Sequence, residues 1–181
     1  MKKKIIQATE PVEIRLNKFI ANAGICSRRD ADQLILSGKV TVNDQVVQVL
    51  GTKIMPTDKI TYLKKIIQSE KLQYVLLNKP KDFITTTQDP QNRRTVMTLI
   101  EKACVERIYP VGRLDRHTTG LLLFTNDGDL AKRLTHPKYK IKKIYQLEID
   151  KPIIEAHYNE ITAGVHLEDG LASVDHLAIL T

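Results

Sequence analysis

The apolar run GLLLFT occupies residues 120–125 and stops at the turn residues Asn126-Asp127-Gly128. So short a run between turn residues is typical of a buried strand, because a helix usually needs about 10 residues or more. A second run, YVLL at residues 74–77, ends at Asn78-Lys79-Pro80 and indicates another strand. Strand-like segments outnumber helical ones and lie partly in hairpins, so the sequence predicts an α+β fold with a largely antiparallel sheet.

The first part of the chain has the pattern of a helix–helix–hairpin unit. One helix should end at Gly24, since Leu16, Phe19, Ile20 and Ala23 follow helical spacing before it. A second should begin at Ser27, which has Asp30 three residues on, and stop at Gly38. Residues 39–42 and 46–49 should then pair around an Asn43-Asp44 turn, and a further strand is expected at 59–63.

Beyond the polar stretch at residues 68–71, which indicates a linker, the pattern predicts a second unit. Besides the strands at 74–77 and 120–125, it predicts helices over residues 95–102, 129–134 and 152–163, and strands over 144–149, 165–167, 171–174 and 177–180.

Charge is distributed unevenly along the chain. The net charge is +7, but residues 1–143 carry +13 and residues 144–181 carry −6. Because a charge acts over about 8 Å at physiological salt, a polyanion would respond to the basic part rather than to the average. The alternative is a scatter of solvated surface charges. No apolar run approaches the roughly 20 residues of a membrane span, and no signal peptide is indicated, so we expect a cytoplasmic protein.

Several classes of site have no support in the sequence. Two cysteines, Cys26 and Cys104, are too few for a disulfide framework or a zinc site. The chain contains no GxxxxGK[ST], GxGxxG, HExxH or GxSxG motif, and its five histidines are scattered. We therefore expect neither a metal nor a cofactor.

One carboxylate, Asp115, lies in a glycine-flanked loop, VGRLDRHTTG at residues 111–120, just before the apolar strand. Arg113 and Arg116 lie close in sequence, and cationic neighbours favour the ionised form. An ionised carboxylate on a loop held by a rigid strand can act as a nucleophile or a general base. The alternative is a structural aspartate that caps one of the following threonines or pairs with Arg113, and spacing alone favours it.

Basic residues gather in two places. Arg15, Lys18, Arg28, Arg29 and Lys39 lie in the first unit, with Arg28 and Arg29 at a helix start, where guanidinium groups and backbone amides suit phosphate. A second run, residues 138–143, is interleaved with Tyr139 and followed by Tyr145, a pattern that suits backbone tracking with base stacking. Each cluster could equally be a solvated surface.

These motifs carry two resemblances, which together span residues 14–181. Residues 14–72 resemble an S4 RNA-binding domain in RLNKFI (15–20), SRRDA (27–31) and GKVTVND (38–44). Residues 73–181 resemble the catalytic domain of the ribosomal-RNA pseudouridine synthases related to the small-subunit enzyme. The matches there are YVLLNKP, VGRLDRHTTGLLLFTNDG and LTHPKYKIKKIYQLEI, and DPQNRRTV, LTHP and GVHLEDG resemble the branch that acts on large-subunit rRNA.

The resemblance implies a fold and a reaction. It implies a small S4-type helix–helix–hairpin domain followed by a mainly antiparallel-sheet catalytic domain. Asp115 would be the essential aspartate of an isomerase that detaches uracil from ribose, rotates the base and rejoins it through carbon 5, without cofactor or metal. Tyr145 would pack on the flipped base. The partner would be ribosomal RNA, as a large-subunit stem-loop, with the protein a monomer.

Residues expected to contact RNA come from the basic clusters and the matched motifs. They are Arg15, Lys18, Arg28, Arg29, Lys39, Lys79, Arg116, Arg133, Lys142 and Lys143.

The resemblance also has a gap. The family carries a C-terminal EGRxxQxRRM-type motif that brings a basic residue to the catalytic aspartate, and residues 146–181 contain no match to it. We therefore expect a C-terminally incomplete catalytic domain, with Arg113 the one nearby candidate for the missing cation. The runner-up interpretation is an S4-type RNA-binding, ribosome-associated protein without catalysis. An aspartate-based hydrolase ranks far behind, because the second carboxylate that glycosidases need is lacking.

Overall fold

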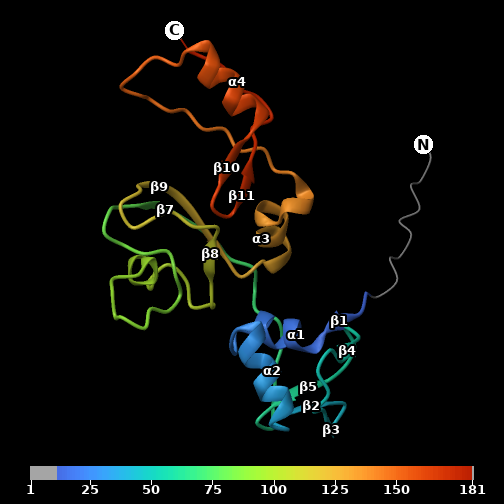
Figure 1. Ribbon diagram of the computed structural model, residues 1–181. Helices are drawn as coiled ribbons and strands as arrows, with labels where there is room; N and C mark the ends of the chain where they lie inside the picture. The colour runs from blue at the N-terminus through green and yellow to red at the C-terminus, as the bar shows by residue number, and fades with distance from the viewer. Residues whose placement is uncertain (1–11, 181) are drawn as a thin grey trace, which may run out of the picture. The chain divides into compact units, whose positions relative to one another are not determined.

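The computed structural model describes residues 12–180, and these fall into two compact units. The first unit ends at Ile141 and contains both the helix–helix–hairpin region and the strand that follows Asp115. The second begins at Lys142. Figure 1 shows the chain coloured from its N- to its C-terminus, with helices and strands labelled where there is room. No helix in the described part of the chain is long and apolar enough to cross a membrane.

The helix–helix–hairpin region forms as the sequence predicts. Its elements are β1 (Ile14–Arg15), α1 (Leu16–Asn22), α2 (Arg28–Leu36), β2 (Val40–Val42), β3 (Gln45–Val46), β4 (Lys53–Ile54), β5 (Ile60–Tyr62) and β6 (Lys65–Ile66). Four strands make an antiparallel sheet in the order β3-β2-β5-β6, and β1 pairs with β4. Asn43 and Asp44, between β2 and β3, have positive φ values of 50° and 65°, as a two-residue hairpin turn of the right twist requires.

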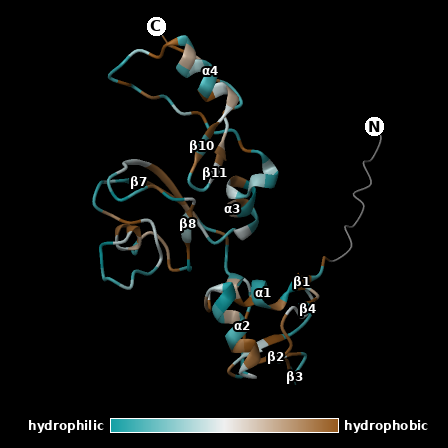
Figure 2. Ribbon diagram, viewed as in Figure 1, coloured by the Kyte–Doolittle hydropathy of each residue, from teal (hydrophilic) through white to brown (hydrophobic). Residues whose placement is uncertain are grey.

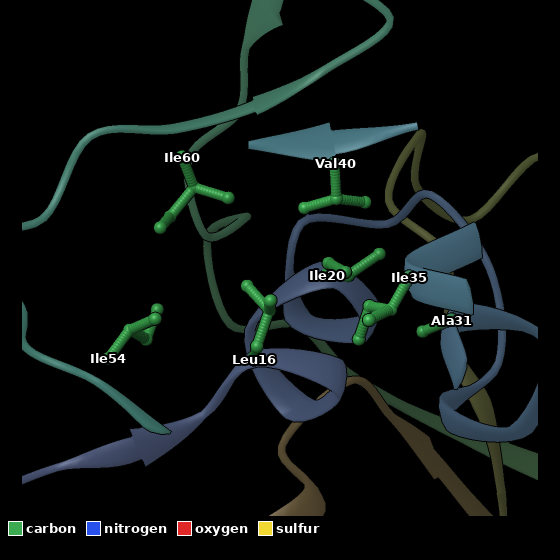
Figure 3. Packing of buried hydrophobic residues seen from close by; sticks show 7 residues of the cluster. All are labelled: Leu16, Ile20, Ala31, Ile35, Val40, Ile54 and Ile60. Atoms are coloured by element: carbon green, nitrogen blue, oxygen red, sulfur yellow. The ribbon is translucent and has the colours of Figure 1, made fainter. Parts of the chain in front are cut away.

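A single apolar cluster holds this region together. Leu16 and Ile20 lie one helical turn apart on α1, so both point to the same side and are fully buried. Figure 3 shows them packed among residues from α2 and the strands: Ala31, Ile35, Val40, Ile54 and Ile60. Two short helices cannot persist alone in water, so this shared burial stabilises them.

A three-stranded antiparallel sheet dominates the rest of the first unit. It contains β7 (Tyr74–Lys79), β8 (Tyr109–Val111) and β9 (Gly120–Thr125), with β9 in the centre. One face packs on a second cluster, formed by Val96, Ile100, Ile108, Leu122 and Phe124. Hydrophobic residues lie along these strands in Figure 2, and the opposite face leaves Leu76 and Leu121 exposed. The 3₁₀ helices η1 (Val96–Leu99) and η2 (Pro137–Tyr139) and the helix α3 (Gly128–Thr135) complete this part.

The second unit contains the helix α4 (Glu155–Ala163) and an antiparallel hairpin of β10 (Val165–Leu167) and β11 (Gly170–Ala172). The predicted strands over 144–149 and 177–180 are wrong, because both segments are irregular. Alternating apolar residues give a side-chain pattern, but a strand forms only beside a partner that takes its backbone hydrogen bonds. Ile144 and Leu147 are accordingly 94% and 80% exposed.

Replacing Ile20 by alanine should destabilise the first apolar cluster by about 2–5 kcal/mol, since the side chain is fully buried and its loss leaves a cavity. Native-state hydrogen exchange at the amides of α1 and α2 measures this, and their protection should fall accordingly. Val49→Ala, at a 70% exposed position, is the control and should change protection by less than about 0.5 kcal/mol. Equal effects of the two substitutions would contradict the assigned core.

Candidate active site

The Asp115 loop, residues 112–119, joins β8 to β9 and is bounded by two glycines with positive φ. Gly112 has φ +78° and Gly120 has φ +134°, and a Cβ at either would meet open space. The glycines are therefore required by backbone conformation rather than by crowding. They let the chain turn sharply out of β8 and back into β9, which places the loop at the end of the central strand.

The backbone of this loop is held from one preceding segment, residues 79–85. Thr85 Oγ1 donates to the carbonyl oxygen of Leu114 at 2.7 Å and accepts from its N–H at 3.2 Å. The N–H of Asp82 donates to the carbonyl oxygen of Arg116 at 2.9 Å. Because the loop contributes only backbone groups to these hydrogen bonds, they hold its backbone without involving its side chains.

Lys79 supplies the largest share of these contacts. Its side chain is fully buried. Its ammonium donates to the carbonyl oxygens of Thr118 (2.8 Å), Asp115 (2.9 Å), Pro80 (3.1 Å) and Arg116 (3.2 Å). An ammonium has three protons and accepts nothing, so four carbonyl oxygens satisfy it fully. The prediction that Lys79 contacts RNA is therefore wrong, because its charge is enclosed and already bound.

The side chain of Asp115 is exposed. Within residues 12–180 its carboxylate makes no hydrogen bond and no ion pair, with the loop threonines or with Arg113. Its contacts are backbone ones: the carbonyl oxygen accepts from Lys79 and from the N–H of Thr118, at 3.1 Å. Among the described residues, therefore, the Asp115 side chain neither caps one of the following threonines nor pairs with Arg113, although spacing alone favours such a structural role. A carboxylate held only through its backbone can act on a ligand.

The arginines beside Asp115 behave differently from each other. Arg116 Nη2 lies 3.3 Å from the carboxylate of Asp82, which also lies 3.7 Å from Nδ1 of His117. Arg113 is exposed and has no ion pair in the described part of the chain. Sequence patterns missed Asp82 and Thr85, since both are ordinary loop residues that act only through contacts across the fold.

The predicted RNA-contacting residues of the helix–helix–hairpin region are mostly exposed. Arg15, Arg28, Arg29 and Lys39 lie at the surface, and Arg28 donates to Asn17 Oδ1 at 3.3 Å. At the start of α2, the N–H of Asp30 donates to Ser27 Oγ at 3.2 Å, which confirms the predicted cap. Lys18 differs, because its ammonium is paired with Asp129 at 2.7 Å.

The other predicted site residues lie on α3 or in the second unit. Arg133 is exposed on α3. Lys142, Lys143 and Tyr145 belong to the irregular start of the second unit, and Tyr145 is 76% exposed. Among the described residues no three His, Cys, Asp or Glu side chains gather as metal ligands would.

Comparison with known proteins shows which family the chain belongs to. The model described as RNA pseudouridylate synthase matches residues 73–170, which include the whole Asp115 loop, and the S4 domain model matches residues 14–60. This chain belongs to the RNA pseudouridine synthase family. It combines an S4 domain with a pseudouridine synthase domain, as the sequence predicts.

The names of individual relatives of this pseudouridine synthase agree with the family assignment. An uncharacterized RNA pseudouridine synthase of Aquifex aeolicus is 42% identical over 171 residues, covering 93% of this chain and 68% of that protein. Ribosomal large subunit pseudouridine synthase B of Bacillus subtilis is 44% identical over 156 residues, covering 86% and 64%. A crystal structure of pseudouridylate synthase matches with a TM-score of 0.55 and 29% identity, covering 93% of this chain and 73% of that one.

In the segment that follows Thr85, Arg93 and Asp89 form an ion pair that depends on pH. Arg93 donates to the Asp89 carboxylate through Nη2 at 2.7 Å, Nε at 3.1 Å and its backbone N–H at 2.7 Å. These hydrogen bonds, above all those of the guanidinium, hold the pKa of Asp89 at about 2. The ordinary value is about 3.9.

Because the folded protein favours the ionised carboxylate, this stabilisation should be present above about pH 4 and be lost as the pH falls toward 2. Carboxyl-carbon NMR of the pseudouridine synthase checks this, with Asp89 expected to titrate near pH 2 in the wild type. In an Arg93→Gln variant the pKa should rise toward the ordinary value. An Asp89 titration near pH 4 in the folded wild type would contradict the ion pair.

Proposed function

We propose that the protein converts a uridine of large-subunit ribosomal RNA to pseudouridine, with Asp115 as the essential aspartate. The observation that carries this is an exposed carboxylate on a loop whose backbone is held by Lys79, Asp82 and Thr85. Relatives in Bacillus subtilis and Pseudomonas aeruginosa, 44% and 38% identical, are named ribosomal large subunit pseudouridine synthase B. The chain spans 64% and 43% of their lengths. That it shares the activity of these longer proteins is therefore part of what we propose.

The reaction needs a positioned carboxylate and little else. The bond from ribose C1′ to N1 of uracil breaks, the base rotates, and C1′ bonds to C5. The hydrogen of C5 is lost as a proton and N1 regains one, so no atom is gained and nothing is oxidised. A single ionised aspartate can act as nucleophile or base in such a step. Much of the rate enhancement then comes from positioning the carboxylate, because a displacement of about 1 Å can lower the reaction rate about 10²-fold.

Reaching C1′ and C5 requires the uridine to leave its stack, at a cost of a few kcal/mol. We propose that Tyr145 offsets this cost by packing on the flipped base, since aromatic stacking is worth about 1–3 kcal/mol per base. Its ring is exposed and therefore accessible. Lys142 and Lys143, exposed beside it, would hold the flanking phosphates.

The S4 domain would position the RNA. Arg15, Arg28, Arg29 and Lys39 present positive charge at the surface of a rigid, small domain, and such contacts fix register without reading sequence. Lys18 would join them only by exchanging Asp129 for a phosphate.

We propose domains at residues 14–72 and 73–181, a ribosomal-RNA stem-loop as the partner, a monomeric protein, and the cytoplasm as its compartment.

A second candidate is an RNA-binding protein without catalysis. One observation favours it: among residues 12–180 no cation pairs with the Asp115 carboxylate, and Arg113 does not take that place. The two candidates agree on RNA binding and differ in whether pseudouridine forms, so an activity assay separates them.

Asp115→Asn in the full-length protein should abolish product while leaving RNA binding unchanged, because an amide has the shape of the carboxylate but neither its charge nor its basicity. Release of tritium from RNA labelled at uridine C5 measures the reaction, on unmodified large-subunit rRNA fragments. Asp169→Asn, in the exposed β10–β11 turn, is the matched control and should retain full activity. Equal tritium release from Asp115→Asn would exclude the assigned role.

RNA binding should depend on salt through the S4 domain. Replacing both Arg28 and Arg29 by glutamine should lower the slope of log affinity against log salt by about 1 for each phosphate that is no longer neutralised. Fluorescence anisotropy with a labelled rRNA stem-loop over a salt series checks this. Glutamine at Lys102 and Lys151, both exposed and both outside the S4 domain, removes the same net charge and should leave the slope nearly unchanged. Matching slopes for the two double variants would refute an S4 phosphate surface.

A further inference from the structure

The polar segment that the sequence indicates as a linker is hydrogen-bonded to both parts that it joins. The N–H of Glu70 donates to the carbonyl oxygen of Asn22, the last residue of α1, at 2.8 Å. Further along, the side chain of Asn126 donates to the carbonyl oxygen of Lys71 at 2.9 Å and accepts from the N–H of Gln73 at 2.8 Å. A flexible tether makes no such bonds, so this segment is a joint of defined structure.

The carboxylate of Glu70 extends the joint on both sides. Its Oε2 accepts from the backbone N–H of Arg107, two residues before β8, at 3.3 Å. On the side of the S4 domain it lies against Gly24, where a Cβ would overlap the carboxylate. Gly24 also has φ +73°. The turn between α1 and α2 therefore needs glycine both for its conformation and for the room that Glu70 occupies.

These contacts connect the S4 domain to the strand that leads into the Asp115 loop. Glu70 bonds α1 through its backbone and the start of β8 through its side chain, and all of these residues lie in the first compact unit. The ion pair of Lys18 with Asp129 is a second contact between the same parts. It is exposed and contributes little to stability, so Glu70 carries more of the restraint.

We propose that Glu70 is a specificity-determining residue: by fixing the S4 domain against β8, it sets which uridine of an S4-bound RNA reaches Asp115. This inference rests on the proposed function. Phosphate contacts hold RNA without reading its sequence. The S4 domain can therefore select a uridine only through the distance and direction from its own surface to Asp115. A freely moving tether would let several uridines reach the same carboxylate.

The first test maps where pseudouridine forms on an unmodified large-subunit rRNA fragment, using the full-length protein, carbodiimide labelling and primer extension. Glu70→Ala should lower the ratio of product at the wild type's preferred uridine to product at neighbouring uridines about 10-fold, since a displacement of about 1 Å can change a rate about 10²-fold. Glu70→Gln keeps an oxygen that can accept from the Arg107 N–H and should keep most of the ratio. Ser69→Ala alters an exposed neighbour in the same linker and should leave the ratio unchanged.

The second test measures the joint without any reaction. Residual dipolar couplings of the wild type should fit one alignment tensor for the S4 domain and the strands β7–β9 together, and those of Ser69→Ala should do the same. Glu70→Ala should need two tensors, because the S4 domain then moves separately. Gly24→Ala puts a methyl group where the carboxylate lies, so it should also need two tensors and should shift the product ratio in the same direction.

A folded Glu70→Ala with the wild-type product ratio overturns the proposal, and so does one that loses activity equally at every uridine. Two alignment tensors in the wild type overturn it as well. If Glu70→Ala does not fold, Gly24→Ala decides by the same criteria. Failure of the proposed function gives a different result: the wild type forms no pseudouridine, or Asp115→Asn forms as much as the wild type. An unchanged ratio for Glu70→Ala beside an inactive Asp115→Asn overturns the specificity role alone.

Discussion

The ammonium of Lys79 lies buried at the end of β7, and a buried charge needs acceptors on every side that water would otherwise occupy. The Asp115 loop supplies three of the four, and Pro80 supplies the last. The pairing of β7 with β9 sets this arrangement, because it places Lys79 opposite Gly120, where the loop rejoins the sheet. Together with the hydrogen bonds of Thr85 and Asp82, these contacts hold the backbone of the Asp115 loop.

The sequence predicts the elements that depend on local pattern. The strand at 120–125 and the helix start at Ser27 occur where turn residues and spacing indicate them. Segments 144–149 and 177–180 are not strands, because alternation says nothing about whether a partner strand is present. Lys79 is misassigned to RNA for a related reason: a lysine in a basic chain suggests a phosphate contact, and only the fold reveals the carbonyls around it.

The proposed function gives different roles to the S4 domain and to the pseudouridine synthase domain. Seven apolar residues of the S4 domain share one core, and its arginines lie outside that core. In the proposed function their positive charge would hold the phosphate backbone without regard to base identity. The loop before β9 offers a single exposed carboxylate, Asp115, to which the proposed function gives the chemistry.

A crystal structure of the full-length protein with an rRNA stem-loop bound tests the central claim most directly. The account predicts a uridine turned out of its stack, with a carboxylate oxygen of Asp115 about 3–3.5 Å from the reacting sugar or base, the distance of a near-attack arrangement. The carbonyl oxygens of Asp115, Arg116 and Thr118 should still contact Lys79 Nζ. A bound RNA whose uridine lies away from Asp115, or a loop that has left Lys79 while the uridine is in place, would contradict it.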